Sequence, residues 1–274
     1  GSPAPPPRTR QTAYKVQIAP KAVRLAGRLF YYFCKKSADL HSIQFSKTAH
    51  IYSMRIRTKT ASVANKLFIS AAAVWGISYQ AGIYSGRLDF SVFRMFTELS
   101  NAACAAYFAL CAAILVLSPE RDAGDSPFVC IKGLCTMCIS LTGIIAAVAL
   151  MHTINFTSAE GISMFVLHVA TPAATVADWL IFDKKGRFSQ WMPAVWTSAP
   201  LAYFVYIMIS AAADPYMAKR FPYPFLDCET LGIPLYLFCI GTITALYVLF
   251  GFALQYGDLI LRIRSSSKPC KTAA

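Results

Sequence analysis

The sequence predicts an all-α fold: a polytopic membrane protein with six transmembrane helices in a bundle and both termini cytoplasmic. The chain has 274 residues, of which 56% are hydrophobic and only 14% are charged. An average soluble domain is about 25% charged, so this chain is depleted in charge. Its apolar residues fall in six long blocks, and its basic residues gather at alternate ends of those blocks. These three observations together predict the fold.

The six apolar blocks are the expected membrane helices. Each reaches the roughly 20 residues that a helix needs to cross a membrane, and the first is the shortest. They lie at residues 66–84, 92–117, 130–151, 162–182, 193–213 and 232–256. Between the last two blocks, the run FPYPFLD contains Pro222 and Pro224, which restrict its backbone. We expect this loop to form an ordered cap.

The distribution of basic residues predicts the orientation of the chain. Of its 26 Lys and Arg residues, 22 fall in residues 1–66, in the loops 118–132 and 183–191, and near the C-terminus. Cytoplasmic loops of membrane proteins are enriched in Lys and Arg, and an even number of helices also puts both ends on one side. The sequence does not identify the membrane.

Three parts of the chain follow from the blocks and the charges. Residues 1–62 are expected to form a basic cytoplasmic arm. Residues 63–260 would form the six-helix transmembrane domain, and residues 261–274 a basic cytoplasmic tail. This organisation describes an integral, multi-pass membrane protein.

The arm contains a segment, residues 18–36, with the period of an amphipathic helix. Lys21, Arg24, Arg28 and Lys35 fall in one narrow arc of that helix, and the opposite side is apolar. Such a helix is suited to an anionic membrane surface, which is the expected partner of the arm. A solvated arm without a special role and an organelle-targeting segment are the alternatives. Nucleic-acid binding is not expected, because the basic stretch adjoins a spanning helix, and no required protein partner is evident.

Two of the apolar blocks carry polar side chains, which usually mark a site when they lie at membrane depth. In the second block, Arg94, Thr97, Glu98 and Asn101 share about 100° of the helix surface, and Arg94 and Glu98 are one turn apart and can pair. Both Thr97 and His168, in the fourth block, lie five or six residues inside the outer end of their helices. Both are therefore expected roughly 8–9 Å below the outer interface.

The fourth block carries its own polar face, which consists of His168, Thr171, Thr175 and Asp178. If this face and that of the second block both point into the bundle, the hydroxyl of Thr97 and the imidazole of His168 meet. Asp178 lies about 15 Å along the helix from His168, which is too far to orient the imidazole directly. We therefore expect a structural role for Asp178.

Thr97 and His168 are the candidate catalytic residues. A hydroxyl is a poor nucleophile until a base takes its proton, and His is the side chain best suited to that near neutral pH. Among the candidate substrate-binding residues, Asn101 could donate to an oxyanion, Arg94 could hold a carboxylate head group, and Glu98 lies beside them. The alternative is polar packing between helices, in which Thr bonds its own helix and His bridges two helices.

Four runs of the sequence, FTELSN, LHVATPAATVADWLIF, PLAYFVY and YPFLD, resemble the bacterial Pr6Pr six-helix membrane proteins. Those are similar to the androgen-induced protein and androgen-dependent TFPI-regulating protein family, and the resemblance covers roughly residues 66–257. In animal members, a Thr in helix two and a His in a later helix act as a lipid hydrolase on esters of hydroxylated fatty acids. Thr97 and His168 are the matching positions.

The resemblance implies a carboxylic ester hydrolase that acts on a lipid substrate and needs no cofactor. Two departures qualify that implication. The run TELSN follows the bacterial pattern and adds polarity that the animal members lack. The motifs alone imply no activity for the bacterial branch.

A membrane transporter or proton-pathway protein is the strongest alternative function. Arg94, Glu98, His168 and Asp178 could relay protons through the bundle. Against this, the sequence contains neither an internal repeat nor a pair of broken helices. A non-catalytic membrane protein also stays open.

Cofactor-binding functions have less support in the sequence. A haem or metal site would have to use His152 and His168, the two histidines outside the arm. A retinal protein is not expected, because no Lys is placed in the middle of a predicted helix to form a Schiff base. Cys135 and Cys138 form a CxxC, but a zinc site needs four ligands, so packing is the favoured interpretation.

Overall fold

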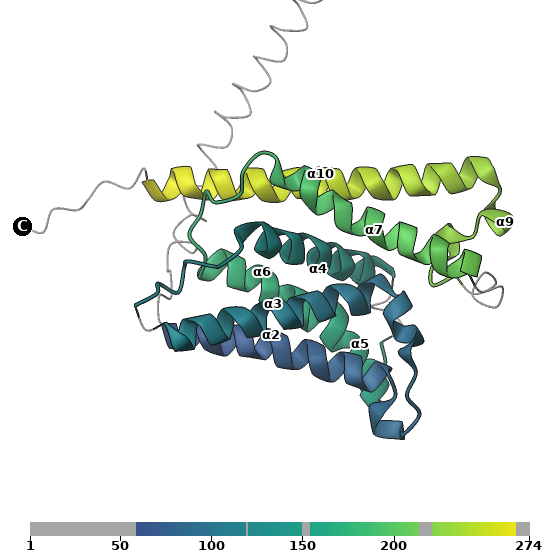
Figure 1. Ribbon diagram of the computed structural model, residues 1–274, viewed down its shortest axis with the longest axis horizontal. Coiled ribbons are helices and arrows are strands. Elements are labelled where there is room, and N and C mark those ends of the chain that lie inside the picture. The colour runs from purple at the N-terminus through teal and green to yellow at the C-terminus, as the bar shows by residue number, and fades with distance from the viewer. Residues whose placement is uncertain (1–58, 119, 150–153, 214–220, 267–274) are drawn as a thin grey trace, which may run out of the picture. The chain divides into compact units, whose positions relative to one another are not determined.

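The computed structural model describes residues 59–118, 120–149, 154–213 and 221–266, and these form helices and connecting segments with no strand. Six of the helical segments are long enough and apolar enough to cross a membrane, which confirms the all-α, six-helix prediction. They are α2 (Lys59–Gln80), α3 (Phe96–Leu117), α4 (Val129–Ala149), α5 to α6 (Ala159–Ile181), α7 (Met192–Ala213) and α10 (Ile233–Ser266) (Figure 1). The amphipathic segment 18–36 lies outside the described residues.

Helix α4 lies in the middle of the bundle (Figure 1). It contacts α3, α6, α7 and α10. Helix α2 packs against α3 and α6 on one side of the bundle, while α7 and α10 lie together on the other side. Helix α4 therefore has neighbours on several sides, and a site next to it can contain residues from more than one of them.

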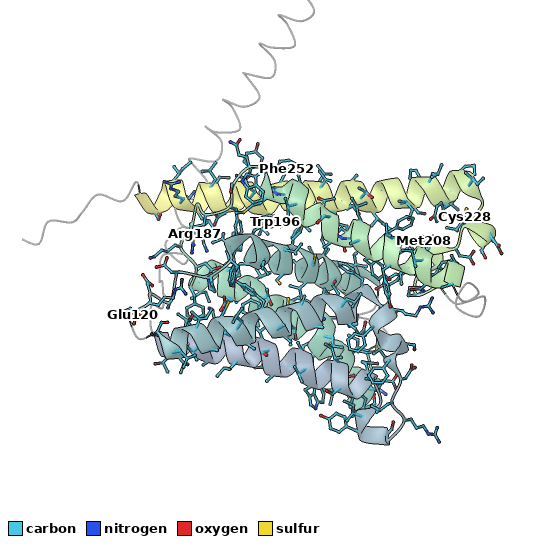
Figure 2. The ribbon with its side chains drawn as sticks, in the orientation of Figure 1. Glu120, Arg187, Trp196, Met208, Cys228 and Phe252 are labelled. Carbon is cyan, nitrogen blue, oxygen red and sulfur yellow. The ribbon has the colours of Figure 1, made fainter. Side chains whose placement is uncertain are left out.

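Helices α4 and α7 pack closely around one large aromatic side chain, that of Trp196. The indole ring of Trp196, from α7, is fully buried and points into the bundle (Figure 2). A Cβ atom at Gly133 of α4 would overlap that ring, so the glycine allows the two helices to approach each other. The indole nitrogen of Trp196 donates to the carbonyl of Cys130 at 2.8 Å. By contrast, Phe252 lies on the outer face of α10 and is 39% exposed, as a lipid-facing side chain would be.

Two helices extend past their predicted ends. Helix α2 begins at Lys59, so the expected boundary between arm and membrane domain at residue 62 falls inside a helix. Helix α10 continues to Ser266, beyond the predicted end at 256 and through the boundary expected at 260. The apolar block stops near Asp258, but that carboxylate is buried and accepts the backbone N–H groups of Arg187 and Phe188. A polar residue with partners in the fold does not end a helix.

The fourth membrane helix changes its winding at the candidate histidine. It consists of α5 (Ala159–Phe165), the π-helical segment η5 (Val166–Ala170) and α6 (Thr171–Ile181). Pro172 has no N–H to donate to the carbonyl of His168 four residues earlier, and its ring would crowd that carbonyl in a regular helix. A π turn accommodates the proline, and such turns often occur at functional sites. His168 lies within it.

Candidate functional site

A cavity of about 300 Å³ lies between α3, α4, η5, α7, α10 and the loop that joins the last two helices. Thr97 and His168 both line this cavity, so the structure brings the two candidate catalytic residues to one space. Apolar side chains make up most of its wall, among them Ile145, Ala146, Leu201, Phe204, Ile240 and Ile243. Its volume is at the low end of the roughly 300–1,000 Å³ that small-molecule sites occupy.

Thr97 is the second residue of α3, not a residue five positions inside a helix as predicted. The helix begins later because η3 (Phe90–Arg94) precedes it and Met95 is extended. The N–H groups in the first turn of a helix have no partner within the helix, and this end carries a partial positive charge. The position therefore favours negative charge developing near the Thr97 hydroxyl.

The hydroxyl of Tyr223 supplies the missing partner at this helix end. It accepts the backbone N–H of Phe96 at 3.1 Å, because the helix has no side-chain cap of its own at Met95. Thr97 and Tyr223 line the same cavity. Tyr223 belongs to the loop FPYPFLD, and Phe225 and Leu226 of that loop line the cavity with it, as a cap would. The sequence pattern drew attention to the loop but indicated no role for its tyrosine.

Burial controls the protonation state of Tyr223. It raises the pKa of the phenol above its ordinary value of 10.0, and the hydrogen bond from the N–H of Phe96 opposes that shift without cancelling it. At neutral pH the phenol therefore keeps its proton. It can accept a hydrogen bond from Phe96 and still donate one.

The imidazole of His168 is held in one tautomer. Its Nδ1 atom lies 2.9 Å from the carbonyl oxygen of Met164. A carbonyl can only accept, so Nδ1 carries the proton and Nε2 has the lone pair. This is the neutral form that can accept a proton through Nε2.

Asn101 links the two elements that carry the candidate pair. Its Nδ2 atom donates to the carbonyl of Thr97 at 2.9 Å and to the carbonyl of Leu167, in η5, at 3.1 Å. The side chain is fully buried, and both amide hydrogens are used. Asn101 is therefore placed to position Thr97 and His168, and it has no hydrogen left for an oxyanion.

The other two predicted substrate-binding residues lie beside the site. Arg94 ends η3, one residue before the N-cap of α3, so it does not share a helical face with Glu98 as predicted. Glu98 is in the first turn of α3 and is 7% exposed. Arg94, Glu98 and Asn101 are not among the described residues that line the cavity.

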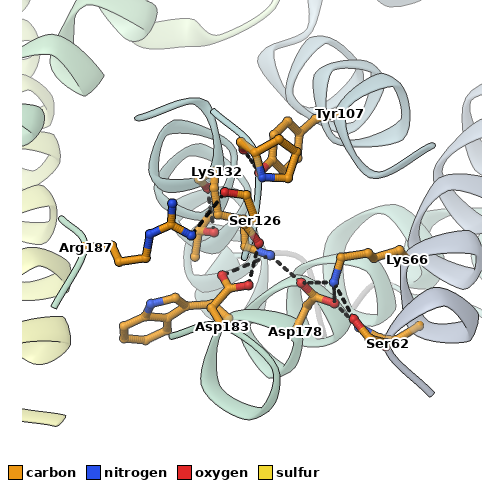
Figure 3. Close-up of polar contacts among 12 residues, drawn as sticks. Ser62, Lys66, Tyr107, Ser126, Lys132, Asp178, Asp183 and Arg187 are labelled. Atoms are coloured by element: carbon orange, nitrogen blue, oxygen red, sulfur yellow. Dashed lines mark hydrogen bonds and ion pairs between the residues drawn. The ribbon is translucent and has the colours of Figure 1, made fainter. Parts of the chain in front are cut away.

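A second polar cluster, which the sequence pattern did not predict, surrounds Asp178 in α6. Lys66 of α2 lies 2.9 Å from one carboxylate oxygen, and Lys132 of α4 binds the other (Figure 3). Lys132 also lies 3.4 Å from Asp183, whose carboxylate accepts the hydroxyl of Ser126 at 2.6 Å. The two lysines and Asp178 are at most 1% exposed. The cluster joins three helices and balances two positive with two negative charges.

The sequence predicts no Lys in the middle of a membrane helix, but the structure places two lysines inside the helices. Lys66 is the eighth residue of α2 and Lys132 the fourth of α4, and both are buried. Each lies at the edge of an apolar block, where the sequence pattern resembles a loop. The polar face that ends in Asp178 was the available signal, because a buried carboxylate requires a partner.

Metal and redox chemistry find little support in the described part of the chain. No group of three or more His, Cys, Asp or Glu residues there is placed to hold a metal ion, and His152 lies outside it. Cys135 and Cys138 are free thiols packed in the core. Comparisons of the chain with models of protein families, with curated proteins and with solved structures give no match.

Proposed function

We propose that this protein hydrolyses lipid esters, with Thr97 as the nucleophile and His168 as the general base. The observation that supports this proposal best is that the two residues line one apolar cavity, although they come from different helices. The resemblance to the Pr6Pr membrane proteins points to the same pair. In this proposal the protein is an integral, multi-pass membrane protein whose termini are cytoplasmic and whose basic arm binds an anionic membrane surface.

The proposed reaction has two steps. Nε2 of His168 accepts the proton of Thr97 as its oxygen attacks the ester carbonyl, and the resulting imidazolium gives that proton to the departing alcohol. This leaves an ester between Thr97 and the acyl group. His168 then takes a proton from a water molecule that attacks this ester, and the acid is released as Thr97 recovers its proton. The hydrogen bond from Nδ1 to Met164 fits this role, because it leaves Nε2 as the base.

The walls of the cavity define the class of substrate. They are mostly apolar and therefore suit an acyl chain, while the small volume limits the enclosed part to the ester and the adjoining methylenes. Arg94 does not line the cavity, so recognition of a carboxylate there is not part of this proposal. Esters of hydroxylated fatty acids are the members of the class that the resemblance suggests.

The test is ester turnover by detergent-purified protein on a panel of long-chain and branched fatty-acid esters. Thr97→Ala and His168→Ala should each lower kcat/KM by at least about 100-fold, the low end for a lost general base. Thr197→Ala is the matched control, because this hydroxyl lines the same cavity but donates to the carbonyl of Pro193 at 2.8 Å. If no ester is cleaved, or if the control loses as much activity as the other two, the proposed pair is wrong.

Proton transfer across the bundle is a second candidate function. It is supported by the polar face of the fourth membrane helix, between the cavity and the charged cluster around Asp178. The hydroxyls of Thr171 and Thr175 are fully buried and have no hydrogen-bond partner among the described residues. They lie between His168 of the cavity and Asp178 of the charged cluster. Water molecules at these hydroxyls would connect the two sites. Proton flux into protein-containing vesicles that is lost in Asp178→Asn, without any ester turnover, would favour this function.

A further inference from the structure

We infer that Tyr223 is a further catalytic residue, whose hydroxyl donates a hydrogen bond to the oxyanion formed when Thr97 attacks an ester. This inference rests on the proposed function. A tetrahedral intermediate needs at least one donor aimed at the developing charge, and that donor is often the largest single contribution to catalysis. The sequence offered Asn101 for this task, but both of its amide hydrogens bind backbone carbonyls.

The contacts of the phenol leave its own hydrogen available. The oxygen of Tyr223 accepts the N–H of Phe96 at 3.1 Å, and Tyr223 lines the same cavity as Thr97, the next residue along the chain. In the tetrahedral intermediate, the oxyanion and the Thr97 oxygen are bonded to the same carbon atom. Because the phenol is hydrogen-bonded to the residue directly before Thr97 and lines the same cavity, its hydrogen reaches the oxyanion after a small shift.

Three other hydroxyls of the cavity wall use their hydrogens elsewhere. Thr142 donates to the carbonyl of Cys138 at 3.0 Å, and Thr197 donates to that of Pro193 at 2.8 Å. The phenol of Tyr203 donates to the carbonyl of Arg94 at 2.9 Å. These bonds hold the wall together, whereas the phenol of Tyr223 is hydrogen-bonded to the residue directly before the nucleophile.

The loop holds Tyr223 rigidly, as a donor of this kind requires. Its ring stacks on Phe225 with centroids 5.2 Å apart, and Tyr203 packs against it at 6.3 Å. Leu226 is buried at the end of the short helical turn that follows. Pro224, directly after Tyr223, restricts the backbone on both sides of their bond. A donor already in place needs no reorganisation when charge develops.

The first experiment compares two variants that each lose one buried phenol hydroxyl, one at the cavity and one away from it. Tyr223→Phe keeps the ring and should lower kcat by about 10²–10³-fold, the usual loss for one oxyanion donor. KM should stay unchanged, because the hydroxyl acts on the transition state. Tyr107→Phe is the control, since the buried phenol of Tyr107 donates to the carbonyl of Pro127 at 2.8 Å and does not line the cavity, and it should leave kcat unchanged. A trifluoromethyl ketone that adds to Thr97 should lose affinity for Tyr223→Phe by the same factor as kcat.

A second variant separates chemistry from folding, because Tyr223→Phe also leaves the N–H of Phe96 without its partner. Replacement of Tyr223 by 3,5-difluorotyrosine keeps the ring and the oxygen but makes the phenol more acidic. The alkaline fall in kcat should then move to lower pH, since only the protonated phenol can donate. A merely structural role predicts no such shift.

The outcomes distinguish this inference from the function on which it rests. If the native protein cleaves an ester and Thr97→Ala does not, while Tyr223→Phe keeps its kcat or the difluorotyrosine protein keeps its pH profile, only the inference fails. If the native protein cleaves no ester, the proposed function fails, and the inference fails with it.

Discussion

Asp178 is the residue on which the charge balance inside the bundle depends. Its carboxylate binds both Lys66 and Lys132, and all three side chains are at most 1% exposed. Removal of one partner of a buried ion pair leaves a charge without compensation, which costs about 3–5 kcal/mol. We therefore expect Asp178→Asn to lower the free energy of unfolding by about this amount, measured by denaturation in detergent.

The control for this experiment is a salt bridge at the surface. Lys184 lies 2.7 Å from Asp125, but its side chain is 39% exposed. The hydrogen bond to Asp125 raises the pKa of Lys184, yet solvent screens an exposed pair. Lys184→Met should leave stability unchanged within error. Equal losses in the two variants would show that the buried cluster has no special structural role.

Individual residues differ in how visible they are in the sequence. Thr97 and His168 could be found because a polar side chain inside an apolar run is costly and therefore conspicuous. Tyr223 could not, because tyrosines near helix ends are ordinary interfacial anchors. Its role depends on its hydrogen bond with Phe96 and on the cavity that it shares with Thr97, and both residues are far away in the chain. Such contacts between distant segments are not encoded in any local pattern.

At the scale of elements, the approach of α4 to the π turn sets the position of His168. A Cβ atom at Gly143 would lie 2.9 Å from the Cβ of Pro172 and 3.2 Å from the carbonyl oxygen of His168. Neither atom can move away easily, because one belongs to a ring and the other to the backbone. We expect Gly143→Ala to displace η5, to lower ester turnover and to reduce the melting temperature.

Gly241 of α10 gives the matched comparison. It also lies within a membrane helix, but a Cβ atom there would meet no other atom within 4 Å. Gly241→Ala should keep the activity and raise stability by roughly 0.5–1 kcal/mol, because alanine favours the helix. From highest to lowest, the expected order of melting temperatures is therefore Gly241→Ala, the native protein and Gly143→Ala. A Gly143→Ala protein with native stability and turnover would contradict this account of the π turn.

The sequence predicted which segments are helical better than where each helix begins or ends. Hydropathy located all six membrane helices, because apolar runs of this length are rare outside membrane spans. It placed the start of the second helix at 92, whereas α3 starts at Phe96. There, Asp89 accepts the N–H of Ser91 at 2.8 Å and begins η3 instead. Local capping bonds of this kind move helix ends without changing the apolar pattern.

For the whole molecule, the distribution of basic residues predicts that both ends face the cytoplasm. Two of the basic residues on that side, Lys66 and Lys132, add no net charge there, because Asp178 and Asp183 neutralise them inside the bundle. The remaining excess of Lys and Arg still lies on one side. Reporters that are active only in the cytoplasm, fused to each terminus in turn, should both be active. Activity at one end alone would exclude an even number of crossings.

The length of α10 makes the molecule sensitive to the thickness of the membrane. Its 34 residues measure about 51 Å, whereas the hydrocarbon core of a bilayer is about 30 Å thick. The excess must be accommodated by tilting or by a segment that projects into the head groups. Near its far end, Asp258 is bonded to the backbone of Arg187 and Phe188, so α10 cannot tilt without moving its neighbours. Ile240 and Ile243 of the same helix line the cavity. A change in bilayer thickness that tilts α10 would therefore also change the shape of the site.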